Sequence, residues 1–320
     1  MSDRLATETF GPGERGDGGR FTRQNSKFRD WVTADGSSGF PAAAGRYHLY
    51  VSWACPWAHR TIILRELKGL PGAIGMSVVD PIRDERGWAF GDGPGTTGDP
   101  LHDWDLLSEA YAATDPDFDG RITVPVLWDT ETGRVVNNES ADIVVMLNEA
   151  FDAFAEHPER DYYPTDLRPV IDPLNRRVYE NVNNGVYASG FASSQEAYEE
   201  AVVPLFHTLD ELDERLEDRR YLFGDEQTLA DWRLFTTLLR FDAVYYSHFK
   251  CNLRRIVNYP NLWPYLRDLY ATPGVAETVD MDQIKRHYYV THGGINPSGI
   301  VPVGPELDFT EPQDRAQLAD

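Results

Sequence analysis

Residues 47–60 read YHLYVSWACPWAHR, and the fold depends on the transition that they contain. The β-rich run 47–52 leads to Cys55 and then to Pro56, which opens a segment with apolar side chains at helical spacing. Proline is tolerated in the first turn of a helix because the N–H that it lacks would be unpaired there. Another β-rich run follows at 76–79. This order predicts a strand–helix–strand unit with a parallel sheet.

The following segments complete a small α/β domain, which we expect to span residues 46–155. Two strands are predicted at 122–128 and 134–136, joined by a short turn-rich loop, and a helix is predicted at 140–151. A polar insertion at 83–120 separates this half from the first strand–helix–strand unit. It is too long for a simple connection, and such insertions in compact domains usually serve a function.

The rest of the chain has the pattern of helices alone and predicts an all-helical domain at 165–292. Apolar positions recur three and four apart at 170–186, 194–217, 228–246, 262–271 and 275–289. Thr228 and Asp231 have the spacing of a capping box. We expect residues 1–45 to form an irregular extension with aromatic anchors at Phe21, Phe28 and Trp31. Residues 293–320 carry several prolines and are expected to form an extended tail.

The composition excludes several classes of partner. The chain has 52 acidic and 30 basic residues and a formal net charge of −22, so nucleic acid and anionic membrane surfaces would be repelled. Only four of the basic residues are lysines, which together with the acid excess predicts a halophilic origin. Charge repulsion in such a protein is screened by concentrated salt. We see no apolar run of about 20 residues and expect a soluble, cytoplasmic protein.

Two cysteines cannot form a disulfide framework, and their spacing matches no metal site, so we expect no metal. Cys55 is predicted to be a nucleophile, because the N-terminus of a helix stabilises a thiolate and lowers the usual thiol pKa of about 8.5. The alternative is a small buried apolar residue, the usual fate of an intracellular cysteine. Cys251 has no comparable context and is predicted to be structural.

Two further motifs leave alternatives open. A cis Val124-Pro125 bond would turn the Val124 backbone outward beside Cys55, where an extended peptide could pair with it. A trans proline at a strand edge is the commoner arrangement. Glu139 and Ser140 open a helix, with Ser140 as the expected N-cap, and its free N–H groups could receive a carboxylate. An ordinary capped helix explains the same residues.

Taken together, these motifs resemble the cytosolic glutathione transferases, and more narrowly their Xi class, the glutathionyl-hydroquinone reductases. The matching segments are CPWAHR at 55–60, GW at 87–88, TVPVLWD at 123–129, NGVY at 184–187, FDAVY at 241–245, HFKCN at 248–252, HYY at 287–289 and INP at 295–297. The resemblance implies an enzyme with an α/β plus all-α architecture, in which an N-terminal thioredoxin-like domain precedes an all-helical glutathione-transferase domain.

The resemblance also implies that Cys55 forms a mixed disulfide with glutathione. The residues implied to bind this co-substrate are Trp88, Arg121, Val124, Pro125, Glu139 and Ser140. Val124 would pair with the cysteinyl backbone, Glu139 and Ser140 would hold the γ-glutamyl end, and the first two would contact the glycyl side. In a halophile the thiol could instead be a γ-glutamyl thiol without glycine, which would leave Trp88 and Arg121 without that contact.

The implied substrate is a small aromatic compound of the hydroquinone type. Attack of the Cys55 thiolate on the sulfur of a glutathionyl-hydroquinone leaves an aromatic carbon that must gain a proton, and a tyrosine O–H can supply it. Tyr187 and one or both of Tyr288 and Tyr289 are implied to line this pocket, although core packing is the common fate of a helical tyrosine. Neighbouring helix positions point about 100° apart, so we favour Tyr288 over Tyr289.

Two other functions fit parts of the sequence. Cys55 alone could support an omega-like general thiol transferase or a reductase of the dehydroascorbate type, and the fold could also serve as a non-catalytic binding module. The resemblance further implies a homodimer formed through the helical domains. The apolar run 235–249 could supply an uncharged contact patch or could simply be the domain core. Because like charges repel, we expect the dimer to loosen when salt is removed.

Overall fold

The computed structural model describes residue 14 and residues 16–318 of the 320-residue chain. The chain divides into two compact units. Within the described residues, the first unit comprises Gln24–Asp161 and Glu277–Val301, and the second comprises Tyr162–Ala276 with the segments that end at Arg23 and begin at Pro302. Residues 277–301 therefore pack with the first unit, although their helical pattern led us to group them with the helical domain. The predicted domain limits stay a prediction.

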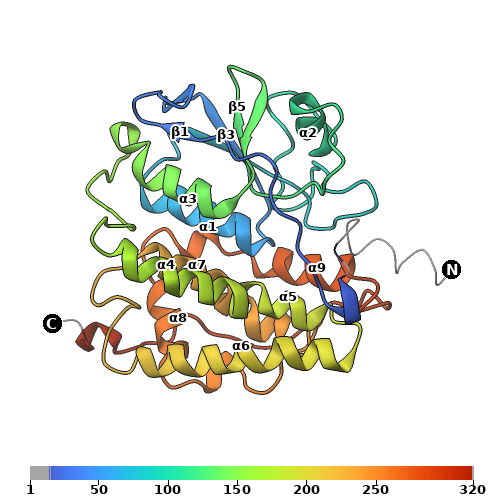
Figure 1. Ribbon diagram of the computed structural model, residues 1–320, viewed down its shortest axis with the longest axis vertical. Coiled ribbons are helices and arrows are strands. Elements are labelled where there is room, and N and C mark those ends of the chain that lie inside the picture. Colours follow the sequence, from blue (N-terminus) through green and yellow to red (C-terminus); the bar gives the residue numbers. More distant parts are fainter. Residues whose placement is uncertain (1–13, 15, 319–320) are drawn as a thin grey trace. The chain divides into compact units, whose positions relative to one another are not determined.

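A four-stranded mixed sheet forms the centre of the first unit (Figure 1). Its strands, in spatial order, are β4 (Ile74–Val78), β3 (Tyr47–Val51), β5 (Val126–Asp129) and β6 (Arg134–Asn137). β3 runs parallel to β4 and antiparallel to β5, and β5 runs antiparallel to β6. Every residue of β3 is buried, as expected for a central strand rich in apolar side chains.

Two helices pack with this sheet and complete the thioredoxin-like arrangement. The order of strands and helices along the chain is the predicted one. α1 (Pro56–Leu67) connects β3 to β4, and α3 (Ser140–Glu149) follows β6; the two helices pack against each other. β5 begins at Val126 rather than at 122, because the residues before it form a bend at the Val124-Pro125 peptide. The helix α9 (Met281–Thr291) also belongs to this unit.

The predicted insertion is held by short-range pairing rather than by a long element. Phe90 N–H donates to Asp105 O at 2.8 Å and Leu107 N–H donates to Trp88 O at 2.9 Å, so the two arms of the insertion lie side by side. α2 (Ser108–Thr114) follows the second arm and contacts β6. The insertion is therefore an ordered loop that presents Trp88 near its start.

The N-terminal extension is more regular than expected over its described part. β1 (Val32–Thr33) and β2 (Phe40–Pro41) form a small parallel pair, and η1 (Asp17–Gly19) is a 3₁₀ turn. Phe28, one of the predicted anchors, packs in the first unit with its ring centroid 5.6 Å from that of Tyr111. Phe21 anchors the second unit, 5.4 Å from the ring of Phe191. Residues 1–13 of the predicted extension lie outside the described residues.

The second unit is helical, as predicted. Its longer helices are α4 (Arg168–Val178), α5 (Gly185–Gly190), α6 (Gln195–Arg215), α7 (Leu229–Arg240) and α8 (Leu262–Tyr270). π-helical turns at η3 (Tyr179–Asn183) and η4 (Phe241–Tyr245) interrupt the helices expected at 170–186 and 228–246. A π turn needs one extra residue, which a search for 3.6-residue periodicity does not detect. Short 3₁₀ turns are η2 (Asp152–Phe154), η5 (Ile256–Asn258), η6 (Ala276–Thr278) and η7 (Arg315–Leu318).

The core of the second unit contains the aromatic run that was a candidate contact patch. Phe235, Phe241, Tyr245 and Phe249 are each 0% exposed within the single chain. The patch interpretation of this run is therefore wrong, and the core interpretation is correct. The predicted capping box is confirmed: Thr228 N–H donates to an Asp231 carboxylate oxygen at 2.7 Å and Ala230 N–H donates to the Thr228 hydroxyl at 3.3 Å.

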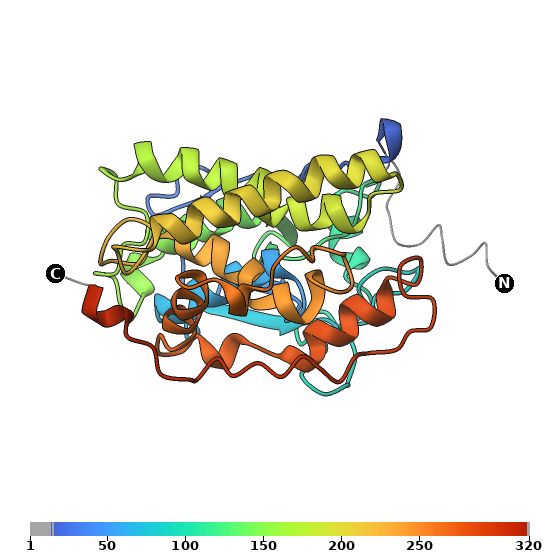
Figure 2. The same ribbon diagram turned by 90° about the horizontal axis from the view of Figure 1, so that it is seen from below.

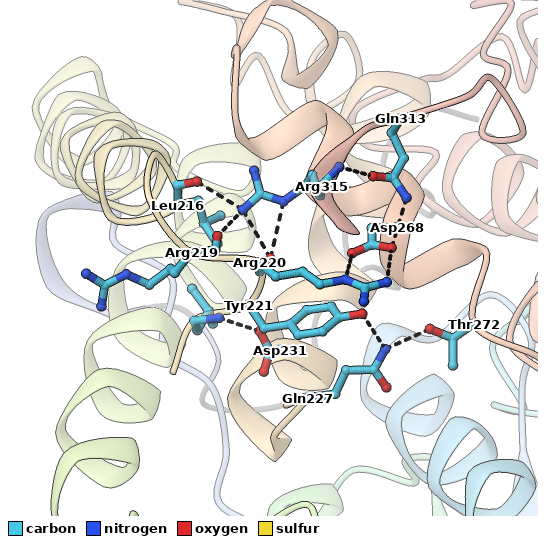
Figure 3. Close-up of polar contacts among 11 residues, drawn as sticks. Leu216, Arg219, Arg220, Tyr221, Gln227, Asp231, Asp268, Thr272, Gln313 and Arg315 are labelled. Carbon is cyan, nitrogen blue, oxygen red and sulfur yellow. Dashed lines mark hydrogen bonds and ion pairs between the residues drawn. The ribbon is translucent and has the colours of Figure 1, made fainter. Parts of the chain in front are cut away.

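The C-terminal segment from Pro302 runs without helix or strand up to η7, which lies beside α8 (Figure 2). Arg315 is 2% exposed, and its guanidinium donates to the carbonyl oxygens of Leu216 at 2.9 Å, Arg220 at 3.1 Å and Arg219 (Figure 3). Gln313 donates to Asp268, which also forms a bidentate ion pair with Arg220. One tail residue thus satisfies carbonyl groups that follow the end of α6.

No helix among the described residues is long and apolar enough to cross a membrane.

Candidate active site

Cys55 lies where the central strand ends and the first helix begins. It is the N-cap of α1, with extended backbone (φ −78°, ψ 119°), and Pro56 is the first helical residue. Its carbonyl accepts a hydrogen bond from His59 N–H at 2.9 Å, and the residue is 9% exposed. N–H groups of a first helical turn lack intrahelical partners, and together with the helix dipole they favour an anion at this position. The backbone thus supplies what a reactive thiolate needs.

The Val124 backbone faces Cys55. The Cys55 Sγ–H donates to Val124 O at 3.5 Å, and the Val124-Pro125 peptide is cis. Val124 is buried, and its N–H has no hydrogen-bond partner among the described residues. The sequence left the isomer open, and the structure has the isomer that was associated with backbone pairing.

Glu139 and Ser140 stand at the start of α3. The helix begins at Ser140, so its N-cap is Glu139 and the expected N-cap assignment of Ser140 is wrong by one residue. One oxygen of the Glu139 carboxylate accepts a hydrogen bond from Ala141 N–H at 3.0 Å. The other oxygen accepts from the Ser26 hydroxyl at 3.1 Å. The Ser140 hydroxyl is buried without a partner among the described residues. It is a polar group with unused hydrogen-bonding capacity.

Trp88 lies near the start of the insertion, and Arg121 directly follows its end. Trp88 is 6% exposed and follows Gly87, whose φ of +98° is a conformation that favours glycine. Its indole stacks on the imidazole of His287, with ring centroids 5.1 Å apart. Arg121 is half-buried, and its backbone N–H donates to the side chain of Gln24 at 3.3 Å.

Tyr288 and Tyr289 lie on α9 in the first unit. Tyr288 is 1% exposed, and its ring makes edge contacts with His287 at 5.2 Å and His292 at 5.5 Å. Tyr289 is 5% exposed, and its carbonyl accepts from Asn296 at 2.7 Å. Burial therefore does not separate the two tyrosines, and the preference for Tyr288 stays a prediction.

Tyr187 lies on α5 in the second unit and is 9% exposed. The guanidinium of Arg23 lies over its ring, 4.8 Å from the centroid, and is fixed by donation to Asn184 Oδ1 at 3.0 Å. Phe249 and Tyr245 pack around the same ring at 5.4 and 6.0 Å. Tyr187 thus has an aromatic environment with a cation on one face.

Cys251 is a different kind of thiol from Cys55. It is 0% exposed, and burial raises the pKa of its thiol to about 12. Such a thiol stays protonated at neutral pH and is a poor nucleophile. This environment agrees with the structural role predicted for Cys251.

No group of three or more His, Cys, Asp or Glu side chains in the described part of the chain could hold a metal ion.

Several residues that support the site escaped sequence reasoning. Tyr111 donates its hydroxyl to Thr123 O at 2.8 Å and accepts from Asn138 at 3.1 Å, so it ties the residue before Val124 to the residue before Glu139. Ser26 and His287 contact site residues across long stretches of sequence. Ser26 lies in a segment without periodicity, and His287 is on a helix that pattern alone assigns to the other domain.

Comparisons with known proteins agree with this geometry. The family description "Glutathione S-transferase, N-terminal domain" matches residues 54–150, and its C-terminal counterpart matches residues 195–268. The glutathionyl-hydroquinone reductase YqjG of Escherichia coli is 52% identical over 93% of both chains. PcpF of Sphingobium chlorophenolicum, a glutathionyl-hydroquinone reductase, is 52% identical over 90% of both chains.

Solved structures extend this likeness to three dimensions. The glutathione-bound structure of YqjG superposes with a TM-score of 0.89, covering 91% of this chain and 96% of that one. The Xi-class glutathione transferase of Natrialba magadii is 54% identical, with a TM-score of 0.91 and 93% of both chains covered. The chain belongs to the glutathione transferase family, and within that family to the Xi-class enzymes, the glutathionyl-hydroquinone reductases. The predicted fold class and enzyme class are therefore confirmed.

Proposed function

We propose that the protein removes glutathione from glutathionyl-hydroquinones through a mixed disulfide on Cys55. The observation that carries this proposal is the position of the Cys55 sulfur, at the start of α1 and 3.5 Å from Val124 O. A thiol ligand paired with the Val124 backbone would bring its own sulfur to that of Cys55. The family to which the chain belongs supports the same chemistry.

The reaction divides into two thiol exchanges. The Cys55 thiolate attacks the sulfur of the glutathionyl-hydroquinone, an S–S bond forms and the aromatic C–S bond breaks. The electron pair of that bond stays on the aromatic carbon, which takes up a proton and gives the hydroquinone. A second glutathione thiolate then attacks the mixed disulfide, releases glutathione disulfide and restores the Cys55 thiolate. Overall the aromatic ring is reduced, the thioether sulfur of the substrate and the thiol of the incoming glutathione are oxidised to a disulfide, and no second protein cysteine is needed.

The first unit offers groups for each part of a glutathione molecule. The unpaired Val124 N–H and the carbonyl before Pro125 suit an extended cysteinyl backbone. The unused Ser140 hydroxyl and the Glu139 carboxylate suit the charged γ-glutamyl end. Trp88 and Arg121 are proposed for the glycyl end. A γ-glutamyl thiol without glycine would need only the Val124 backbone and the side chains of Glu139 and Ser140.

Tyrosines are the proposed proton donors for cleavage of the C–S bond. Tyr288 is the first candidate, and Tyr187 and Tyr289 are proposed as further lining residues of the aromatic substrate site. A protonated phenol carries an O–H that can donate a proton.

The direct test is reductive deglutathionylation of a glutathionyl-hydroquinone by the purified protein and by Cys55→Ser. We expect turnover with release of hydroquinone and complete loss of turnover in the variant, with Cys251→Ser as the matched control. A mass spectrum after incubation with glutathione disulfide or γ-glutamylcysteine disulfide would identify the thiol by its adduct on Cys55. An active Cys55→Ser enzyme would contradict the mechanism. Reduction of mixed disulfides alone would support a general thiol transferase, and an inert Cys55 would support a binding module.

Assembly and location are part of the same proposal. We infer a homodimer through the helical unit, in the cytoplasm of a salt-adapted cell; the halophilic origin rests on the net charge of −22. Exposed apolar side chains of this unit include Val170 on α4 and Val203 on α6, which are 52% and 59% exposed. Light scattering across a salt series tests the inference. A monomer at every salt concentration would exclude the dimer, and a dimer that persists in dilute buffer would exclude the electrostatic part.

A further inference from the structure

One face of α9 is bonded to the insertion that carries Trp88. Gln283, His287 and Thr291 are spaced four residues apart and therefore lie on the same side of the helix. The Gln283 amide donates to Pro94 O at 2.9 Å, and the Thr291 hydroxyl accepts from Arg83 N–H at 3.2 Å. His287 Nδ1 lies 2.6 Å from Pro81 O. The helix thus holds the insertion at Arg83 and Pro94, and it holds Pro81 just before the insertion begins.

The central residue of this face, His287, also fixes the plane of the Trp88 ring. Because a carbonyl oxygen can only accept, Nδ1 of His287 carries the hydrogen, and this bond sets the orientation of the imidazole. Tyr288 and His292 pack edge-on against the same imidazole, at 5.2 and 5.7 Å. The Trp88 indole lies on the imidazole face with an angle of only 16° between the planes.

The backbone of Trp88 is held separately. Its carbonyl accepts from Leu107 N–H at 2.9 Å, within the insertion itself, and Gly87 before it closes a turn with Asp84. Removal of the His287 ring would therefore leave the Trp88 backbone held and take away the stacking partner of its indole. The stack on His287 thus orients the Trp88 side chain, and hydrogen bonds within the insertion position its main chain.

We propose that His287 is a positioning residue for Trp88 and, through it, a determinant of which thiol the enzyme prefers. This inference rests on the proposed function, in which Trp88 contacts the glycyl end of glutathione. A misplaced indole would weaken binding of glutathione and leave binding of γ-glutamylcysteine, which has no glycine, unchanged. His287 touches no substrate in this scheme and acts only through Trp88.

The test compares the two thiols in His287→Ala, His287→Phe and wild-type enzyme. For His287→Ala we expect the KM for glutathione to rise about 2- to 10-fold, the range expected from loss of one aromatic stack, with kcat little changed. The KM for γ-glutamylcysteine should not move. His287→Phe keeps an aromatic ring beneath the indole but lacks the Nδ1 bond to Pro81 O, so it should restore the glutathione KM only in part.

The insertion supplies its own matched control. His102 stacks on Trp104 in the same insertion, with ring centroids 4.0 Å apart and an angle of 11° between the planes. His102→Ala removes a stack of the same kind and should leave the ratio of the two KM values unchanged. An equal change in that ratio for His102→Ala and His287→Ala would mean general loosening of the loop and would overturn the proposal, as would no change in His287→Ala.

A spectroscopic readout separates failure of this inference from failure of the proposed function. Near-ultraviolet circular dichroism of the full chain should differ between wild type and His287→Ala, and the difference should vanish when both proteins also carry Trp88→Phe. A difference that survives Trp88→Phe would overturn the coupling of the two residues, whatever the activity. A confirmed coupling together with an unchanged glutathione KM in Trp88→Ala would instead show that the proposed role of Trp88 is wrong.

Discussion

Arg46 and Asp129 form a buried bidentate ion pair, with nitrogen–oxygen distances of 2.8 and 2.7 Å, where the start of β3 meets the end of β5. The two strands are antiparallel, so their other ends lead to Cys55 and to Val124. A shift of one residue would turn the side chains of the strand to the other face. The ion pair therefore helps to hold the register that places the thiol beside the Val124 carbonyl.

Removing one partner of this pair should destabilise the protein strongly. Burial raises the pKa of Asp129, but hydrogen bonds from Arg46 and Thr132 and from Glu131 N–H outweigh it and lower the pKa overall. Arg46→Met leaves a buried carboxylate unpaired, and we expect a loss of about 3–5 kcal/mol in the free energy of unfolding. Urea denaturation measures it. In the double variant with Asp129→Asn the loss should be smaller than the sum of the single losses, and simple additivity would exclude the coupling.

The two thiols should differ sharply in alkylation. In the native protein at pH 7.5, iodoacetamide should modify Cys55 and leave Cys251, whose pKa is raised to about 12 by burial. Intact mass spectrometry should show one adduct before denaturation and two after it. Cys55→Ser should take no adduct in the native state, and Cys251→Ser should react like wild type. Rapid labelling of native Cys55→Ser would contradict the structural assignment of Cys251.

Buried histidines should make the fold sensitive to mild acid. Burial lowers the pKa of His48 and of His248 from 6.5 to about 4. Between these values the unfolded chain binds protons that the folded chain does not, so stability is full above about pH 6.5 and falls as the pH drops towards 4. The shift corresponds to at most about 3 kcal/mol for each histidine.

Urea denaturation at pH 7.5 and 5.0 measures this effect. His48→Gln can keep the hydrogen bond that His48 Nε2 makes with Ser77 at 2.7 Å but cannot be protonated. The variant should therefore lose less stability than wild type on acidification. An identical pH dependence in both proteins would rule out His48 as a source of the acid sensitivity.

The tyrosine proposal distinguishes two substrate types. Tyr288→Phe should slow C–S cleavage of a glutathionyl-hydroquinone about a hundredfold or more, because general acid catalysis contributes on that scale. Reduction of a glutathione mixed disulfide should be unaffected, since that leaving group is a thiolate and needs no proton at carbon. Tyr187→Phe and Tyr289→Phe assayed on both substrates show whether either shares the role. Equal losses on both substrates would point to a packing role instead.

The sequence predicts the central strand, α1 and the capping box correctly because each depends on neighbours within one turn or one strand. Pro56 after Cys55, and Thr228 three residues before Asp231, are local signals. The same reasoning placed the N-cap of α3 at Ser140, one residue too late, because serine is a far commoner N-cap residue than glutamate, the residue type at position 139. The π turns escaped for a related reason, since their extra residue leaves the apolar pattern almost unchanged.

Contacts between distant segments account for most of what the sequence did not predict. α9 has an ordinary amphipathic pattern, yet the structure places it with the first unit, where His287 stacks on Trp88. Nothing in the neighbourhood of either residue specifies the other. Ser26 is similar, because its bond to Glu139 follows from the path of an irregular segment and not from a repeating pattern.

The last prediction concerns the tail, where Arg315 donates to three carbonyl oxygens beyond the end of α6 (Figure 3). Arg315→Ala removes the donor from the buried Leu216 carbonyl and from the part-buried carbonyls of Arg219 and Arg220, and a buried unsatisfied group costs about 1–3 kcal/mol. We expect the free energy of unfolding to fall by at least about 2 kcal/mol and the tail to become sensitive to limited proteolysis.

Arg219→Ala is the control, because its side chain is 38% exposed and pairs with Asp218 at the surface, where the loss should stay below about 1 kcal/mol. Equal stability of the two variants would show that the Arg315 bonds do not hold the tail. A stability loss without new cleavage sites after residue 301 would show that the tail is held by other contacts, such as Phe309 against Tyr270, whose ring centroids are 5.2 Å apart.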